Sequence, residues 1–125
     1  SKGAFSEVQL VSTGAGVVRL GDNLWLVCKV TGFSLQTQNY VWHWFRQPFG
    51  KGVEWVTGMH PYNGDKWYSH SMKNRASISA DSSKNEFYLQ LNTMSVADSA
   101  VYFCSREDTM RGVYLGSEQK QETVL

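Results

Sequence analysis

The chain has 125 residues, of which 42% are hydrophobic, and its 12 basic and 11 acidic side chains give a formal net charge of +1. This length favours one domain with a single core, and without a basic excess the chain is a poor partner for nucleic acid or for an anionic membrane surface. No apolar run approaches the roughly 18 residues of a membrane-spanning helix, so we expect no membrane insertion.

Runs of alternating apolar and polar residues, rich in Val, Thr, Ser and aromatic residues, predict a series of short strands. The runs are "EVQLV" (7–11), "LWLVCKV" (24–30), "YVWHWFRQ" (40–47), "VEWVTGMH" (53–60), "ASISAD" (76–81), "EFYLQL" (86–91) and "AVYFCSR" (100–106). Turn clusters lie between several of them, and Asn63-Gly64 is the strongest hairpin signal. Only "TMSVADSA" (93–100) suggests a helical turn. The pattern predicts an all-β antiparallel sandwich or barrel.

The two cysteines, Cys28 and Cys104, lack the close spacing of zinc sites and of redox Cys-x-x-Cys motifs. In each strand the alternation places the cysteine on the core-facing side. We therefore expect a structural disulfide between two sheets, with Trp44 packed against it. Such a bond implies an oxidising compartment.

Residues for catalysis are not arranged in any known motif. The three histidines, His43, His60 and His70, lie in or beside predicted loops, without a Gly-x-Ser-x-Gly sequence, a His-x-x-x-His pair or a neighbouring thiol. They are interpreted as surface or rim residues. The chain is predicted not to be an enzyme and to need no cofactor or metal.

A family resemblance rests on Cys28, on Trp44 followed by "FRQPFGKGVEWV", and on "DSAVYFC" at the second cysteine. From Glu7 to about Arg106 the chain resembles the variable domain of an immunoglobulin heavy chain. The resemblance implies a V-type, two-sheet, antiparallel Greek-key sandwich with one inter-sheet disulfide. We expect this domain over residues 7–118, after an N-terminal extension at 1–6, with 119–125 as an atypical end of the last strand or a frayed tail.

The resemblance also gives roles to framework residues. Tyr102, two positions before Cys104, is expected to form a tyrosine corner, in which its hydroxyl bonds to backbone near Asp98. Arg75 and Asp98 are expected to form a buried or half-buried ion pair at the base of the sandwich.

Three hypervariable-type loops are implied at about Phe33 to His43, Gly58 to Tyr68 and Glu107 to Tyr114. Their mixture of aromatic and hydrogen-bonding side chains is typical of surfaces that bind a protein or other macromolecular antigen. The candidate contacts are Gln36, Gln38, Asn39, Tyr40, His43, His60, Tyr62, Asn63, Asp65, Trp67, Tyr68, Glu107, Asp108, Arg111 and Tyr114. Whether Trp42 joins them or points inward beneath the loop is left open.

A second implied surface faces a partner chain, either a light-chain-like V domain or a second copy of this chain. Its candidate residues are Phe45, Gln47, Val53, Trp55, Phe103 and Leu115. Left bare, they would form an apolar patch. The resemblance also implies a secreted location or the extracellular face of the cell.

The resemblance fails near the end of the chain, where Leu115-Gly116-Ser117-Glu118 stands in place of the family's Trp-Gly-x-Gly. The segment is an unusual joining sequence that still pairs as a strand, a stretch added in preparing the chain, or the native end of a receptor-like domain. We expect part of Tyr114 to Lys120 to pair as an edge strand, and the residues after it to fray.

Two other functions follow from this ending. The first is an invariant V-type receptor or surrogate-chain domain, whose fixed protein partner occupies an otherwise bare sheet edge. The second rests on "ETVL", in which Thr123 and Leu125 resemble a carboxyl-terminal ligand for PDZ domains. The expected disulfide argues against the second, because PDZ domains are cytosolic.

Overall fold

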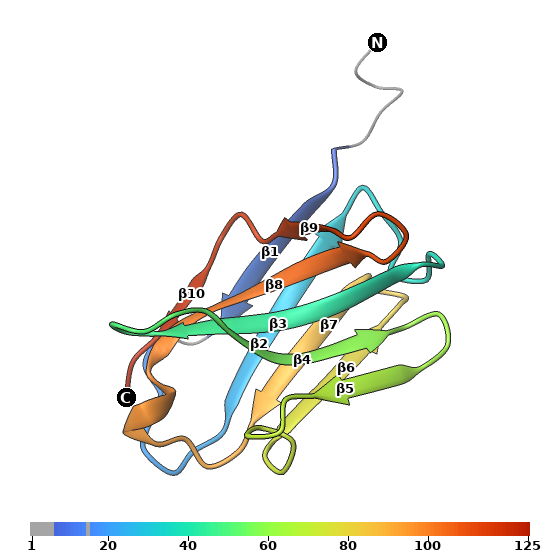
Figure 1. Ribbon diagram of the computed structural model, residues 1–125. Coiled ribbons are helices and arrows are strands. Elements are labelled where there is room, and N and C mark those ends of the chain that lie inside the picture. Colours follow the sequence, from blue (N-terminus) through green and yellow to red (C-terminus); the bar gives the residue numbers. More distant parts are fainter. Residues whose placement is uncertain (1–6, 15) are drawn as a thin grey trace.

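The structure is a computed structural model that describes residues 7–14 and 16–125, so the predicted extension at 1–6 lies outside it. Each predicted run overlaps a strand, and the predicted helical turn contains the 3-10 turn η2 (Figure 1). The elements are β1 (Gln9–Gly14), β2 (Leu24–Thr31), β3 (Tyr40–Pro48), β4 (Glu54–His60), β5 (Asp65–Tyr68), β6 (Ala76–Asp81), β7 (Glu86–Leu91), η2 (Val96–Asp98), β8 (Ala100–Asp108), β9 (Val113–Gly116) and β10 (Gln121–Thr123).

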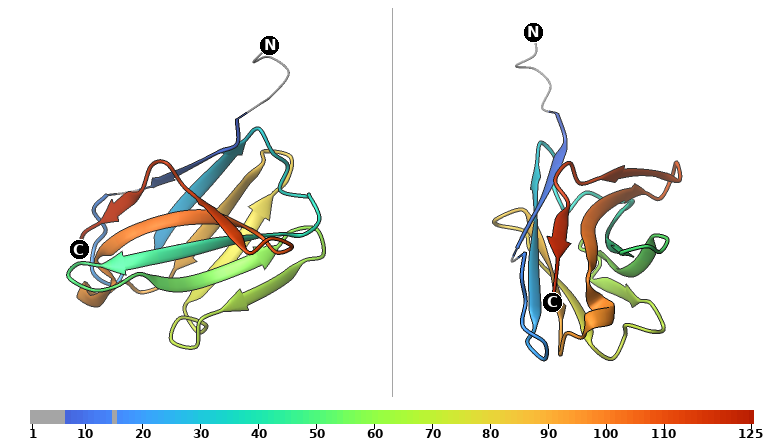
Figure 2. Two further views of the ribbon diagram at one scale, coloured as in Figure 1. Left: turned by 45° about the horizontal axis from the view of Figure 1, so that its top comes forward. Right: turned by 90° about the vertical axis from the view of Figure 1, so that its left-hand side faces the viewer.

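The strands form two antiparallel sheets packed face to face, seen as two layers in the right-hand view of Figure 2. One sheet has the order β1-β2-β7-β6. The other has the order β10-β8-β3-β4-β5, and β9 pairs with a different stretch of β8. This arrangement confirms the predicted V-type sandwich.

The core lies between the sheets and is built from the alternating inward residues of each strand. The disulfide between Cys28 and Cys104 joins β2 to β8 and so crosses from one sheet to the other. Trp44 lies opposite Cys104 in the β3–β8 pairing, and its ring centroid is 5.5 Å from that of Phe87. Trp42 is also fully buried, so it points inward and is not a loop contact.

A charged network closes the base of the sandwich around Asp98, whose side chain is only 2% exposed. The Tyr102 hydroxyl donates to the Asp98 carbonyl at 2.8 Å, which confirms the tyrosine corner. The expected pair is also present, since Arg75 Nη2 lies 2.6 Å from Asp98 Oδ2. Arg46 was not predicted, yet its Nη1 donates to Asp98 Oδ1 at 2.8 Å and its Nε to Glu54 at 3.0 Å.

The last strand is present in two pieces on one edge of β8. Strand β9 pairs with Ser105–Asp108 and β10 pairs with Ala100–Tyr102, so pairing within Tyr114 to Lys120 is confirmed. The expected fraying of the end is wrong. Thr123 is fully buried, and Val124 exchanges backbone hydrogen bonds with Gly16 and Val18. A buried Thr123 also does not fit the interpretation of "ETVL" as a free peptide ligand.

Contacts to β1 hold the connection between β9 and β10, which explains why a segment without an apolar alternation is ordered. The amide of Glu118 donates to the Leu10 carbonyl at 2.9 Å. The Gln121 side chain donates to the Ser12 carbonyl at 2.8 Å, and the Ser12 hydroxyl donates to the Gln119 carbonyl. Backbone and amide hydrogen bonds thus replace apolar anchoring here.

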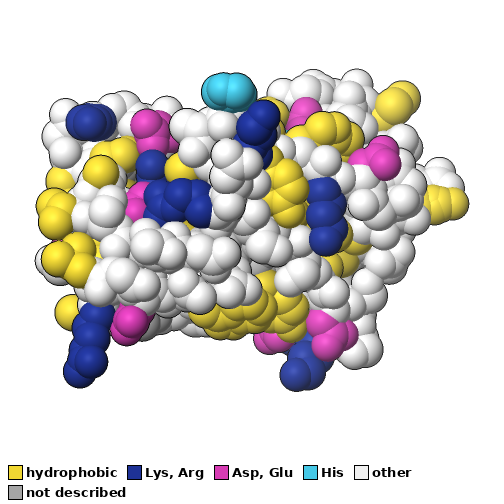
Figure 3. Space-filling model, turned by 90° about the horizontal axis from the view of Figure 1, so that it is seen from below, with side chains coloured by type: hydrophobic (Ala, Val, Ile, Leu, Met, Phe, Trp, Pro, Cys, Tyr) yellow, Lys and Arg dark blue, Asp and Glu magenta, His cyan; other side chains and the backbone are white. Residues whose placement is uncertain are grey.

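Basic and acidic side chains are interspersed on the face shown in Figure 3. This distribution agrees with the formal net charge of +1. Among the residues that the structure describes, no helix has the length and apolar character needed to cross a bilayer.

Candidate functional site

The three predicted loop segments meet at one end of the sandwich, on the right in Figure 1. The β2–β3 loop contacts the β8–β9 loop directly, because both the amide and the hydroxyl of Thr109 donate to the Asn39 carbonyl at 2.9 Å. Below them Tyr40 lies opposite Asp108 across the β3–β8 pairing, and its hydroxyl donates to that carboxylate at 3.3 Å. The rigid sheet therefore fixes the relative position of the first and third loops.

Most of the predicted contacts reach solvent at this end. The exposed ones are Gln36, Gln38, Asn39, Tyr62, Asn63, Asp65, Trp67, Arg111 and Tyr114, and the half-buried ones are Tyr40, His60, Tyr68, Glu107 and Asp108. Tyr62 and Trp67 are the largest exposed rings on the second segment, at 45% and 43% exposure. Both are free to contact a ligand.

The regular structure extends further into the predicted loops than the sequence indicated. Strand β5 (Asp65–Tyr68) pairs with β4, which reduces the second loop to residues 61–64. "DKWY" is too short and too polar to give a strand signal. It pairs because Asn63-Gly64 forms the predicted turn, with Gly64 at a φ of 85°.

His43 was predicted to be a surface or rim residue and a ligand contact, and that location is wrong. The residue lies within β3 and is only 8% exposed. Its ring is held between two partners: Trp55 Nε1 donates to Nδ1 at 3.0 Å, and Nε2 lies 2.7 Å from Glu107 Oε1. Burial lowers the pKa of His43, and this effect outweighs the hydrogen bond and charge of Glu107, which raise it.

Gly58 is the reason that the His43 ring fits. It lies opposite His43 in the β3–β4 pairing, and a Cβ atom built on it would come within 2.5 Å of His43 Nδ1. Trp67 lies on the other side of Gly58 in the β4–β5 pairing. The missing side chain therefore makes room for the histidine ring of β3, and Gly58 separates that strand from the indole on β5.

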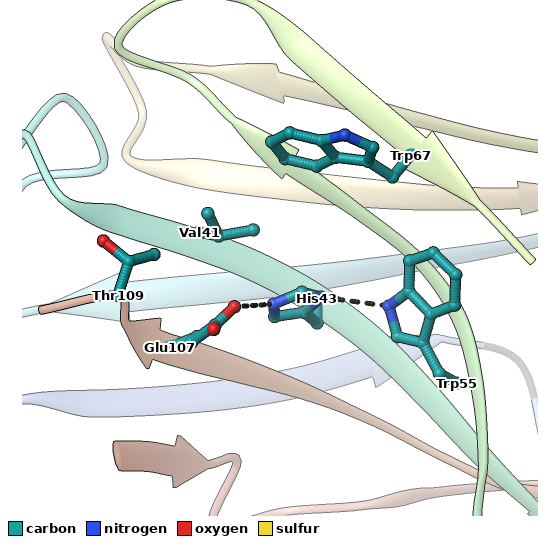
Figure 4. A pocket seen from close by; sticks show the side chains of 6 residues that line it. All are labelled: Val41, His43, Trp55, Trp67, Glu107 and Thr109. Atoms are coloured by element: carbon teal, nitrogen blue, oxygen red, sulfur yellow. Dashed lines mark hydrogen bonds and ion pairs between the residues drawn. The ribbon is translucent and has the colours of Figure 1, made fainter. Parts of the chain in front are cut away.

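A pocket of about 400 Å³ occupies this part of the sheet (Figure 4). It is lined by Val41, His43, Trp55, Trp67, Glu107 and Thr109. Val41 and Thr109 were not among the predicted site residues, and Trp55 was assigned to the partner face only. The pocket depends on cross-strand neighbours, which the sequence does not show.

The outer face of the larger sheet carries most of the predicted partner residues. Phe45 and Phe103 stack with ring centroids 5.5 Å apart, and Tyr114 lies 6.3 Å from Phe45. Val53, immediately before β4, is 57% exposed. Leu115 differs, because it lies opposite Arg106 and packs against the core, so Tyr114 takes the outward position instead.

Arg106 is a further residue that sequence reasoning did not single out. Its guanidinium lies 4.5 Å from the Phe33 ring centroid and 4.9 Å from that of Tyr40. These cation–π contacts attach the first loop to β8.

Metal binding is not indicated by the geometry. In residues 7–14 and 16–125, no three His, Cys, Asp or Glu side chains are grouped so that they could hold an ion. His43 and Glu107, which are bonded to each other, instead form a fixed polar pair on the wall of an otherwise apolar pocket.

Comparisons with known proteins agree with this architecture. A model of the immunoglobulin V-set domain matches residues 15–121. The chain is 42% identical over 106 residues to the mouse "Ig heavy chain V region MOPC 315", covering 85% of this chain and 76% of that protein. It is 43% identical over 99 residues to the human "Immunoglobulin delta heavy chain", covering 79% of this chain but only 19% of that protein. The chain thus spans about a fifth of the human relative.

Proposed function

Because the chain belongs to the immunoglobulin V-set family and is of the antibody heavy-chain variable type, we propose that it binds a macromolecular antigen noncovalently through its loop end. The family is not enzymatic, as was predicted for this chain. The observation that carries the proposal is the meeting of three loop segments at one end of a rigid sandwich, with exposed aromatic and amide side chains on them. The disulfide supports a secreted or cell-surface location.

The test of antigen binding compares exposed rings at the two ends of the sandwich. The chain is screened against an array of purified proteins, and the Kd of the ligand found is measured for each variant by surface plasmon resonance. Tyr62→Ala combined with Trp67→Ala is expected to weaken binding by about thirty-fold or more, the cost of losing an aromatic hot spot.

Phe49→Ala is the matched control for this test, because Phe49 is an aromatic residue of similar exposure (51%) in the β3–β4 turn at the opposite end. It is expected to leave the Kd unchanged. If Phe49→Ala weakened binding as much as the loop variant did, or if the loop variant bound as tightly as the wild type, antigen binding by the loops would be contradicted.

We further propose that the outer sheet face pairs with a light-chain-like V domain. The stacked rings of Phe45 and Phe103, with Tyr114 and the exposed Val53, form an apolar surface of the kind that a partner covers.

Light scattering of the chain, alone and mixed with a light-chain V domain, tests the pairing. The mixture is expected to show a one-to-one complex, and Phe103→Arg is expected to abolish it by placing an unpaired charge in the interface. Trp25→Arg, an exposed aromatic position on the opposite sheet, is the control and should pair normally. A wild-type mixture that keeps the monomer masses would rule out this pairing.

An invariant receptor or surrogate-chain domain is the alternative. Its expected partner site was a bare edge of β8, but β9 and β10 already pair along that edge. Sequences of related clones separate the two functions, because an antibody lineage varies in the three loops and an invariant receptor does not.

A further inference from the structure

The pocket beside His43 combines apolar walls with one carboxylate. In Figure 4 the indoles of Trp67 and Trp55 lie on the β4–β5 side, and Glu107 and Thr109 lie on the β8 side. Val41 and His43 lie between them. A volume of about 400 Å³ falls within the roughly 300–1,000 Å³ of small-molecule pockets and accommodates one ring or one side chain of a larger ligand.

The hydrogen bonds of His43 determine where its proton lies. An indole N–H is only a donor, so Nδ1 of His43, which receives it at 3.0 Å, carries no proton. The proton of the neutral ring is therefore on Nε2, which donates to Glu107 Oε1 at 2.7 Å. A second proton on Nδ1 would break the bond to Trp55, and burial lowers the pKa of His43 in the same sense. The ring thus orients Glu107 but does not neutralise it.

No other cation cancels the charge of Glu107 within residues 7–14 and 16–125. The ion pairs of this part of the chain give Glu107 no Lys or Arg partner. Arg106, its neighbour in sequence, faces the rings of Phe33 and Tyr40 instead. The Glu107 side chain is 24% exposed, so it can be reached from the pocket.

We propose that this pocket takes an organic cation, an ammonium or guanidinium group carried on an apolar or aromatic body. The indoles supply apolar contact and attract the cation through their ring faces, and Glu107 forms the charge-assisted hydrogen bond. An anion would meet the same carboxylate and be repelled. This inference rests on the proposed ligand binding at the loop end and names the chemistry of its central pocket.

The probes are benzylamine, benzyl alcohol and benzoate, which share one ring and differ in charge. Their Kd values for the whole chain are measured by NMR titration at pH 7.5. Benzylamine is expected to bind about ten-fold more tightly than benzyl alcohol, the gain typical of a charged over a neutral hydrogen bond, and benzoate least well.

Variants assign the selectivity to Glu107. In Glu107→Gln the amide oxygen still accepts the proton of His43 Nε2, so the pocket keeps its shape, and the preference for benzylamine is expected to fall to about two-fold or less, leaving only the cation–π contribution. Asp108→Asn is the matched control. That neighbouring carboxylate bonds to Tyr40 and does not line the pocket, so the preference should be unchanged. Trp67→Ala is expected to weaken the binding of benzylamine and of benzyl alcohol to a similar extent.

The ammonium or guanidinium group in the pocket can belong either to a free amine or to a basic side chain of a protein antigen. Nα-acetyl-lysine amide and Nα-acetyl-arginine amide represent the second. Tighter binding of either than of benzylamine assigns the site to protein antigens, and the reverse assigns it to free amines; both results support the shared chemistry.

Equal binding of the three probes, no binding of any, or full selectivity in Glu107→Gln would overturn the cation proposal. Antigen binding is tested separately by Tyr62→Ala alone, without the change at Trp67, because Trp67 lines the pocket and Tyr62 does not. If antigen affinity depends on Tyr62 but benzylamine does not bind to the pocket, the proposed function stands and the cation proposal is wrong.

Discussion

Asp98→Asn is expected to lower the free energy of unfolding by about 3–5 kcal/mol, the usual cost of removing one partner from a buried ion pair. The carboxylate accepts hydrogen bonds from Arg46, Arg75 and the Ser95 amide at 2.8, 2.6 and 2.9 Å. The amide side chain would leave Arg75 without a counter-charge and Arg46 with only the half-exposed Glu54, and Arg46 itself is only 9% exposed. Urea denaturation followed by tryptophan fluorescence measures the loss.

The pH dependence identifies the charge as the cause. Burial alone would raise the pKa of Asp98, but the hydrogen bonds from Arg75, Ser95 and Arg46 outweigh it and hold the pKa well below its ordinary value. A depressed folded-state pKa gives stability that is present above the unfolded value of about 3.9 and is lost as the pH falls below it. We expect the wild-type chain to lose this stability progressively as the pH falls below about 4, and the variant to show a shallower acid slope.

Glu54→Gln is the control, because Glu54 bonds to the same Arg46 but its side chain is 49% exposed. The expected loss is below about 1 kcal/mol, as for exposed pairs. An Asp98→Asn variant that is no less stable than this control, or that keeps the full acid slope, would show that the network contributes little.

The fold was predictable because its core strands carry a strong local signal. In β2 and β7, and in β8 as far as Cys104, every second residue is apolar and buried, and the cysteines fall on the same faces. Strands β5 and β10 have no such signal. "DKWY" and "QET" are held by backbone pairing to neighbours far away in the sequence, and alternation within the segment does not report that pairing.

The site was less predictable than the fold. The loops were located by resemblance, and most of their exposed residues lie where expected. His43 was misplaced because its burial depends on Gly58 and Trp55, which come from the adjacent strand, and the pairing register shifts between Trp44 and Phe45. A one-residue change of register moves side chains to the other face, so the pocket follows only from the three-dimensional structure.

The role of Arg46 in the framework of the sandwich was also not predicted from the sequence. It lies within a family motif, but the sequence indicated only Arg75 as the partner of Asp98. Its inward direction follows the alternation of β3, in which Trp42 and Trp44 also point inward. A charged residue in an inward position is therefore a signal that a buried carboxylate lies nearby.

Replacement of both cysteines by alanine is expected to lower the free energy of unfolding by about 4 kcal/mol, within the usual range for a long closed loop. Cys28 and Cys104 are 76 positions apart, so the bond restricts most of the unfolded chain. Both residues are fully buried, and the lost sulfur atoms add a packing cost. Urea denaturation measures the effect.

The slope of the denaturation curve separates these two causes. A chain without the cross-link exposes more surface when it unfolds, so the m value should rise together with the loss of stability. Cys28→Val with Cys104→Ala restores part of the buried volume without the bond, and it should recover the packing cost but keep the higher m value. An unchanged m value with full recovery of stability in this variant would assign the contribution of the cysteines to packing. A large loss with a raised m value would assign it to the covalent link between β2 and β8, the two strands that fix the sheets on which the loop end is built.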